Sequence, residues 1–350
     1  MKKYLITACA AALVALSFGT LSCSSGKPTL HVYTWADYLD PDVVKDFEKA
    51  NGCRVVLDYF DSNETMYAKI KAGASGYDVI FPTSYQAAIM YEEGLLHQLN
   101  HDALVNRSNI DPKYLKRNAI DADMLYSVPY MLGTTGIGYR ADVLPDLKPS
   151  WSVFLNPVVK GRSTLLNDMR ETMGAALLSL GYSVNSVEES EIAAAAEVVK
   201  QWKREIAKFE NEQYKPGLAS GEFLLVHGYS GDISQVIADN PDANIRYVLP
   251  EEGFMVWCDD MVIPADAPNV ELAEAFLDYF MDPEIAARNM EFTLYKAPNQ
   301  SAYALVSDEL KNDPSVFVPD NLMEKSDTVR LIGDAITLYS KYWDQIKASE

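Results

Sequence analysis

The feature that most constrains this chain is a repeated alternation of short apolar runs with amphipathic segments. Near the start, apolar runs at 30–34, 55–60 and 79–81 alternate with helical patterns at 41–52, 65–72 and 84–93. Pro41 lies in the first turn of the first helical pattern, and Gly52 follows its last turn, as is usual at helix ends. This order of elements is typical of a layered α/β fold.

The same theme continues through the rest of the chain. Further strands are expected at 163–166, 222–226, 244–248 and 255–263, and further helices at 171–180, 187–209, 272–281, 283–290 and 327–346. The segment Ser186-Val-Glu-Glu189 has the pattern of a capping box for the long helix at 187–209. At 350 residues the chain exceeds the usual size of a single core, so two lobes are expected.

The first residues carry the pattern of an export signal. Lys2 and Lys3 precede an apolar run that is too short for a permanent spanning helix. Cys23 is followed by a polar Ser-Ser-Gly tether, as at a bacterial lipoprotein cleavage site. We therefore expect residues 1–22 to be a signal peptide, residues 23–29 a tether, and Cys23 a lipidated membrane anchor. An ordinary signal peptide, cut nearby with Cys23 incidental, is the alternative.

The charge of the chain argues against one class of partner. The formal net charge is −20 at pH 7, and removal of Lys2 and Lys3 with the leader would make it −22 (−20 − 2). Nucleic-acid binding needs basic patches, so it is not expected. An acidic surface suits a cationic ligand, although it also serves solubility.

Cysteine and histidine give little support to metal or redox chemistry. Cys53 and Cys258 both lie in apolar sequence, so we expect two buried thiols, with a disulfide as the alternative. His97 and His101 are four residues apart, but they lie in polar sequence with no acidic motif between them. No metal and no cofactor are expected.

No catalytic motif is present in the sequence. Gly133-Thr-Thr-Gly-Ile-Gly138 looks superficially like a phosphate-binding loop, yet it continues into Tyr139-Arg140 rather than into a helix. We interpret it as a turn or hinge. An enzyme is therefore not favoured.

Aromatic and acidic side chains follow several of the expected strands. Ligands of α/β sheets collect at the carboxyl ends of the strands, and Trp35, Tyr38, Thr83 and Tyr85 all lie there. Packing alone would explain many Trp-x-x-Tyr pairs.

Two further pairs of candidate binding residues stand out. Asp168 and Glu171 lie on one face of a helix start, where capping and the helix dipole also favour acids. Trp257 and Asp259 point to the same side of a strand.

Taken with the Asp61-Ser-Asn-Glu-Thr65 helix start, these motifs resemble the spermidine/putrescine-binding proteins of ABC transporters, from about Leu30 to Ile346. The resemblance implies a two-lobed type II periplasmic binding protein fold, each lobe a mixed sheet flanked by helices, with the ligand cleft between the lobes. It implies that lobe 1 comprises 30–134 with 260–308 and lobe 2 comprises 135–259 with 309–350. The crossings near 133–138 and 257–260 would be hinges.

The resemblance also implies a ligand and a set of contacts. A polyamine carries ammonium groups along a methylene chain, so it needs carboxylates to replace water and aromatic faces worth roughly 0.5–2 kcal/mol each. Asp168, Glu171, Asp232 and Asp259 would hold the ammonium groups. The whole expected ligand-binding set is Trp35, Tyr38, Thr83, Tyr85, Asp168, Glu171, Tyr229, Asp232, Trp257, Asp259 and Tyr295.

One segment departs from the family pattern. In Tyr229-Ser-Gly-Asp232, Tyr229 replaces a Trp and Asp232 follows the putrescine-type members, whereas Asp168 and Glu171 follow the spermidine type. The choice between putrescine and spermidine therefore stays open. The expected protein is an exported periplasmic monomer, anchored by lipid, that delivers its ligand to a membrane permease. The alternatives are a receptor for another small solute, such as a ferric ion, sugar or amino acid, and a surface adhesin or structural lipoprotein.

Overall fold

The computed structural model of the chain describes residues 26–117 and 119–349. The expected signal peptide and Cys23 lie outside these residues. The first strand begins at Thr29, so the last residue of the expected tether already belongs to the sheet. Within the described part of the chain, no helix has both the length and the apolar character needed to cross a membrane.

The strands form one mixed sheet with the order β2-β1-β3-β9-β4-β7-β5-β6; β10 pairs with β9, and β8 pairs with β4. Their bounds are β1 Thr29–Thr34, β2 Arg54–Tyr59, β3 Val79–Ile80, β4 Ser127–Arg140, β5 Ser163–Leu165, β6 Lys208–Phe209, β7 Leu225–Tyr229, β8 Ile245–Val248, β9 Phe254–Val262 and β10 Ser326–Thr328. β1 runs parallel to β2 and β3, and β5 runs parallel to β6 and β7. The two parallel groups are therefore separated by β9 and β4, which pair antiparallel.

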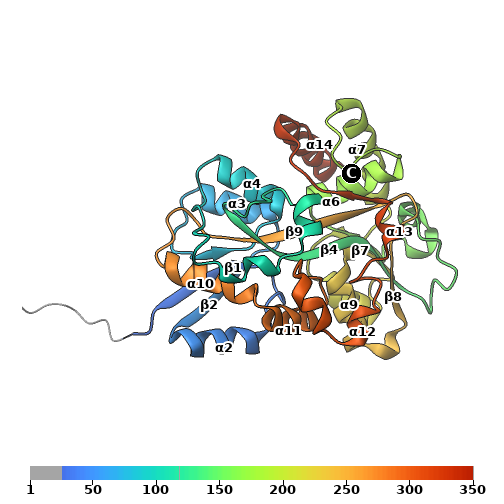
Figure 1. Cartoon of the computed structure of the whole chain (residues 1–350). Coiled ribbons are helices and arrows are strands. Elements are labelled where there is room, and N and C mark those ends of the chain that lie inside the picture. The colour runs from blue at the N-terminus through green and yellow to red at the C-terminus, as the bar shows by residue number, and fades with distance from the viewer. Residues whose placement is uncertain (1–25, 118, 350) are drawn as a thin grey trace, which may run out of the picture.

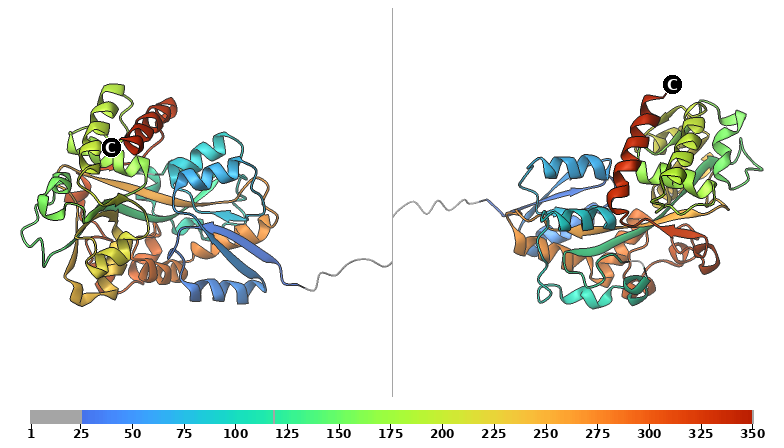
Figure 2. Two further views of the ribbon diagram at one scale, coloured as in Figure 1. Left: turned by 180° about the vertical axis from the view of Figure 1, so that it is seen from behind. Right: turned by 90° about the horizontal axis from the view of Figure 1, so that it is seen from above.

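Helices cover both groups of strands (Figures 1 and 2). Their bounds are α2 Pro41–Asn51, α3 Asn63–Lys71, α4 Ser84–Glu92, α5 Pro112–Arg117, α6 Met169–Ser179, α7 Glu189–Lys203, α8 Tyr214–Ser220, α9 Ser230–Asp239, α10 Val270–Phe280, α11 Pro283–Thr293, α12 Asp308–Lys311, α13 Asp320–Met323 and α14 Ile336–Ala348. Figure 1 places α2, α3, α4 and α10 around β1 and β2, and α6, α7, α9 and α14 around β4 and β7.

Two large hydrophobic cores lie in these two groups. Leu30, Phe47 and Phe276 belong to the first core, and Trp151 and Trp202 belong to the second. Both long strands contribute to both cores. In β4, Met131 packs in the first core and Ile137 in the second; in β9, Trp257 packs in the first and Met255 in the second. The two halves therefore share these strands as their connection, although the residue bounds of the lobes stay a prediction.

The glycine-rich stretch at 133–138 is part of strand β4, so the expectation of a turn there is wrong. The glycines serve close approach across the sheet instead, as glycines inside strands often do. A Cβ atom on Gly133 would lie 2.2 Å from Cζ2 of the Trp257 ring, and one on Gly136 would lie 2.7 Å from the carbonyl oxygen of Val248. No strand was expected over 127–140, because three glycines and a proline mask its apolar pattern.

Three other expectations were wrong in detail. The helix expected at 187–209 ends at Lys203, and β6 follows, because Lys208–Phe209 completes the edge of the sheet beside β5. The helix expected at 327–346 begins only at Ile336, since 326–328 pairs with β9 as β10. The strand expected at 222–226 lies instead at Leu225–Tyr229.

The expected capping box also does not form. The Ser186 hydroxyl accepts a hydrogen bond from the Glu188 amide and donates one to the Glu191 carboxylate, while Glu188 takes the cap position of α7. In contrast, Cys53 and Cys258 are both free and buried, so the expectation of two buried thiols is confirmed.

Candidate functional site

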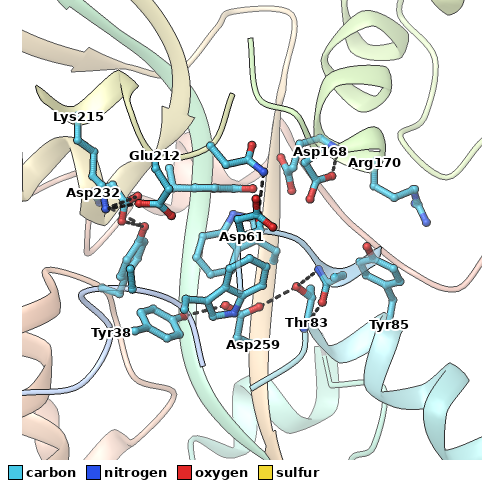
Figure 3. A pocket seen from close by; sticks show the side chains of 18 residues that line it. Tyr38, Asp61, Thr83, Tyr85, Asp168, Arg170, Glu212, Lys215, Asp232 and Asp259 are labelled. Atoms are coloured by element: carbon cyan, nitrogen blue, oxygen red, sulfur yellow. Dashed lines mark hydrogen bonds and ion pairs between the residues drawn. The ribbon is translucent and has the colours of Figure 1, made fainter. Parts of the chain in front are cut away.

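All eleven residues that the sequence predicts as ligand contacts line one pocket between the two groups of elements. Figure 3 shows Asp232 on one side of this pocket, Asp168 on the other, and Asp259 between them with Tyr38 and Thr83. The residues come from segments far apart in sequence, which the sheet brings together. Most follow the carboxyl ends of β1, β3, β5 and β7, where α/β folds collect ligands.

Asp259 is held by hydroxyl groups from two different strand ends. The Tyr38 hydroxyl donates to Oδ2 of Asp259 at 2.9 Å, and the Thr83 hydroxyl donates to Oδ1 at 2.8 Å. Thr83 occupies the cap position of α4, yet its side chain makes no cap hydrogen bond. The hydroxyl that would ordinarily stabilise the helix end is therefore turned to the carboxylate.

Asn63 fixes the orientation of Thr83. The Asn63 side-chain amide donates to Oγ1 of Thr83 at 2.9 Å, and its carbonyl oxygen accepts from the Thr83 backbone amide at 3.1 Å. Asn63 occupies this place because α3 begins there, after Ser62 accepts a hydrogen bond from the Thr65 amide. The helix therefore starts two residues earlier than the sequence pattern indicates.

Asp259 is 5% exposed, and this burial is the main cause that raises the pKa of its carboxyl group to about 7. The hydrogen bonds from Thr83 and Tyr38 lower the pKa, while the charges of Asp260 and Asp168 raise it further. A carboxylate with such a pKa is stabilised by a cation more strongly than an exposed one would be.

A second acidic group begins helix α6. The Asp168 side chain caps this helix by accepting a hydrogen bond from the Glu171 amide at 3.0 Å. The capping role that the sequence suggested is therefore present. Burial raises the pKa of Asp168. Glu171 is also buried; burial first and the Asp168 charge second raise its pKa to about 8. Its Oε2 atom is buried without a hydrogen-bond partner.

Arg170 lies between these two acids in sequence but does not pair with them. Its guanidinium donates to the Arg330 and Val184 carbonyl oxygens and to Oδ1 of Asn185, and it lies over the Tyr85 ring. Figure 3 shows it directed away from Asp168. Among the residues that the structure describes, Asp168, Glu171 and Asp259 form no ion pair within 4 Å.

Asp232 lies in the first turn of α9, just after β7. It accepts hydrogen bonds from the Tyr214 hydroxyl at 2.6 Å and the Tyr295 hydroxyl at 3.0 Å. The Tyr295 ring packs against Gly231, where a Cβ atom would lie 2.5 Å from the ring. Gly231 therefore lets Tyr295 reach Asp232.

Aromatic rings form a continuous wall along the pocket. Trp257 contacts the Tyr229 ring at a centroid distance of 5.6 Å and the Tyr295 ring at 5.4 Å, and Tyr295 contacts Tyr38 at 5.7 Å, all edge to face. Trp35 lies against Phe60 at 4.3 Å, and its ring nitrogen donates to the Phe81 carbonyl. Such faces suit methylene groups and cations.

Sequence reasoning missed several residues of the pocket. They are Ala36, Asp61, Asn63, Arg170, Asn211, Glu212 and Lys215. The Asn211 amide donates to the Asp61 carbonyl oxygen at 2.7 Å, which connects the two sides of the pocket. Asn63 lies within the Asn-Glu-Thr motif that supports the resemblance, so that motif was a usable signal. Asn211 and Glu212 lie in the polar turn before α8 and Lys215 lies in the first turn of that helix, where the sequence has no such signal.

The described residues contain no cluster of three or more histidine, cysteine or acidic side chains that could hold a metal ion. His101 instead bonds to the Met124 carbonyl oxygen at 2.9 Å. The pocket offers carboxylates, hydroxyl groups and aromatic faces, which together can bind a slender cation.

An α/β fold with two cores, two shared strands and a pocket between its halves defines the class: it is the two-lobed fold of periplasmic binding proteins. More particularly, the chain belongs to the bacterial extracellular solute-binding protein family, whose profile matches residues 42–318. The resemblance noted from the sequence is thereby confirmed.

Relatives cover the whole chain. It is 33% identical to the spermidine/putrescine-binding periplasmic protein of Salmonella typhimurium, over 99% of each chain. It is also 33% identical to the putrescine-binding periplasmic protein PotF of Escherichia coli, over 100% of this chain and 99% of that one.

Solved structures agree with this assignment. A putative spermidine/putrescine ABC transporter protein from Listeria monocytogenes superposes with a TM-score of 0.85 at 31% identity, and the TpPotD lipoprotein of Treponema pallidum with 0.82 at 32%. Each comparison covers 91% of this chain and 99% of the other.

Proposed function

We propose that this protein is the polyamine receptor of an ABC importer, binding putrescine or spermidine between its two lobes. The observation that carries the proposal is the set of buried acids Asp168, Glu171 and Asp259, which have no ion-pair partner within the described chain yet share one pocket with four contacting aromatic rings. Burying such acids is costly unless a cation accompanies them. The printed names of the relatives, which include spermidine and putrescine, support the same ligand class.

Each part of a polyamine has a counterpart in this pocket. Ammonium groups would exchange water for the carboxylates of Asp168, Glu171 and Asp259, while the methylene chain would lie along Tyr229 and Trp257. An amino acid or another carboxylated solute would bring its own negative charge next to these acids, so it is disfavoured. A sugar would leave the acids without a countercharge.

The proposed cycle uses the two halves of the molecule as lobes that close on the ligand. We take lobe 1 as 30–134 with 260–308 and lobe 2 as 135–259 with 309–350. The ligand would bridge Asp259 and the α6 acids, and a membrane permease would recognise the closed form. Only contacts that differ between the open and closed forms can shift that equilibrium.

We further propose that the protein is exported, lipidated at Cys23 and monomeric. The lipid would hold the receptor on the membrane that carries the permease, with more than one acyl chain needed for stable attachment. Replacing Cys23 with Ser should move the protein from the membrane fraction to the soluble fraction. An unchanged membrane fraction would contradict lipidation.

Calorimetric titration with putrescine, spermidine, glutamate and a sugar tests the main proposal. We expect saturable binding of at least one polyamine and no binding of the other two solutes. Polyamine at about 100 times its dissociation constant should add roughly 2.7 kcal/mol to the free energy of unfolding. No response to either polyamine would overturn the proposal.

A further inference from the structure

A lysine of the protein itself occupies one end of the pocket. The Lys215 ammonium nitrogen lies 3.1 Å from Oδ2 of Asp37, 3.2 Å from Oε2 of Glu212 and 3.9 Å from Oδ2 of Asp232. Its side chain is only 15% exposed. Lys215 comes from α8 and Asp37 from the loop after β1, so this ion pair joins the two groups of elements. Figure 3 shows Lys215 beside Glu212 and Asp232.

These acids hold the lysine in its charged form. Burial by itself would lower the pKa of Lys215, but Asp232, Glu212 and Asp37 raise it, so the pKa is raised overall. The Asp232 end of the pocket therefore already contains a cation under any physiological condition. This cation has the same chemistry as the end of a polyamine.

Asp259 and the Asp168–Glu171 pair have a different charge environment from Asp232. Among the described residues, the Asp259 carboxylate accepts hydrogen bonds only from the neutral hydroxyl groups of Tyr38 and Thr83, and Oε2 of Glu171 has no hydrogen-bond partner. Within the described chain, no lysine or arginine pairs with Asp259 or with the Asp168–Glu171 pair. The pocket thus keeps two acidic centres without a cation of the protein, and a third centre where Lys215 already supplies one ammonium group to Asp37, Glu212 and Asp232.

We propose that Lys215 acts as an internal ammonium group at the Asp232 end and makes the receptor selective for diamines over triamines. This inference rests on the proposed polyamine-binding function. A diamine places its two ammonium groups at Asp259 and at the Asp168–Glu171 pair. A triamine has a third ammonium group, which must either displace Lys215 or share the Asp232 carboxylate with a like charge.

Lys215 also takes up room at the Asp232 end of the pocket, because it is one of the residues that line it. Removing the Lys215 ammonium would both enlarge the space and leave Asp37, Glu212 and Asp232 free to accept a third ammonium group.

The test compares putrescine and spermidine by calorimetric titration of the full chain and its variants. We expect the unaltered protein to bind putrescine at least about tenfold more tightly than spermidine. Lys215→Met should strengthen spermidine binding by about tenfold and change putrescine binding by less than about threefold. Lys215→Arg, which keeps the positive charge, should retain the preference for putrescine.

Two controls separate selectivity from general effects. Lys160→Met removes a lysine that pairs with Glu205 on the exterior, so it should leave both affinities unchanged. Lys215→Gln repeats the test if the methionine variant unfolds in circular dichroism. The readout is the ratio of the affinities for putrescine and spermidine. If Lys215 had a purely structural role, its loss would weaken the binding of both ligands by a similar factor.

The possible failures are distinguishable. A preference for spermidine in the unaltered protein, or an affinity ratio that is the same with and without Lys215, would overturn this inference and leave the proposed function intact. Binding of neither polyamine would overturn both.

Discussion

The Tyr38 hydroxyl donates a 2.9 Å hydrogen bond to the Asp259 carboxylate, from a residue that lies 221 positions earlier in the chain. Thr83 donates to the other oxygen of the same carboxylate. Because both donors are neutral, Asp259 is oriented without being paired to a cation. A carboxylate that is fixed in this way can add an ammonium group without first losing a salt bridge.

Replacing Asp259 with Asn should weaken polyamine binding by at least about tenfold, or roughly 1.4 kcal/mol. The amide keeps the shape of the side chain but cannot offset the charge of an ammonium group. Calorimetry measures the loss, and thermal unfolding should show that the protein remains folded. Asp46→Asn, which alters an exposed ion pair with Arg288, serves as the matched control. An unchanged isotherm for Asp259→Asn would make the Trp257–Asp259 pair merely structural.

Glu171→Gln should stabilise the ligand-free protein in a pH-dependent manner. The pKa of Glu171 is about 8 in the folded state, above its ordinary value of 4.5, so the folded state binds this proton more tightly than the unfolded state does. The free energy of unfolding therefore falls as pH rises from about 4.5 to about 8.

The glutamine variant lacks this dependence because its side chain does not titrate. Chemical denaturation should show nearly equal stability of the two proteins near pH 5 and a growing advantage for the variant towards pH 8, of the order of a few kcal/mol. The variant should also bind polyamine more weakly. A stability difference that does not change with pH would contradict the raised pKa.

Polyamine binding should release protons near neutral pH. Asp259 and Glu171, with pKa values of about 7 and 8, are partly protonated in the ligand-free protein, and an ammonium group favours their charged forms. The affinity should therefore rise from pH 6 to pH 8. Primary amines keep their charge throughout this range, so the ligand itself does not contribute.

Calorimetry in two buffers of different ionisation enthalpy measures the number of protons released. We expect a positive number for the unaltered protein and a smaller one for Glu171→Gln. Identical heats in both buffers would mean that the acids are fully ionised before the ligand binds.

Gly133→Ala should displace the Trp257 ring, which is part of the aromatic wall of the pocket. The added Cβ atom would lie 2.2 Å from the Trp257 ring, and a ring within a sheet has little freedom to move away. Overpacking of this kind costs about 1–3 kcal/mol of stability, and the displaced ring should also weaken polyamine binding.

Gly174→Ala is the matched control for that variant. Its Cβ atom would meet the Met255 thioether at 2.4 Å, in the second core rather than at a ring that lines the pocket, so stability should fall while binding persists. Thermal unfolding and calorimetry on both variants make the comparison. Equal binding by Gly133→Ala and the unaltered protein would show that the Trp257 position is not critical.

Much of the fold and of the pocket was predictable from local patterns. Strand ends followed by Trp35, Tyr38, Thr83 and Tyr85 point to one edge of a sheet, and the spacing of Trp257 and Asp259 puts them on one side of a strand. These are consequences of backbone periodicity, so they can be read from neighbouring residues.

The same reasoning from local patterns failed where pairing with a distant strand decided the structure. Residues 208–209 and 326–328 are strands only because β5 and β9 offer edges to pair with.

By itself, the sequence determined the layered α/β class, the supply of acids and aromatic rings, and their positions at strand ends, because these depend on short-range spacing. Tertiary structure alone decided that 133–138 is a strand packed against Trp257, that Arg170 is directed away from the acids beside it, and that the Lys215 ammonium lies among Asp37, Glu212 and Asp232. Charge compensation and burial depend on distances between segments that are remote in the chain. The pKa values of Asp259 and Glu171 follow from those distances, and no local pattern encodes them.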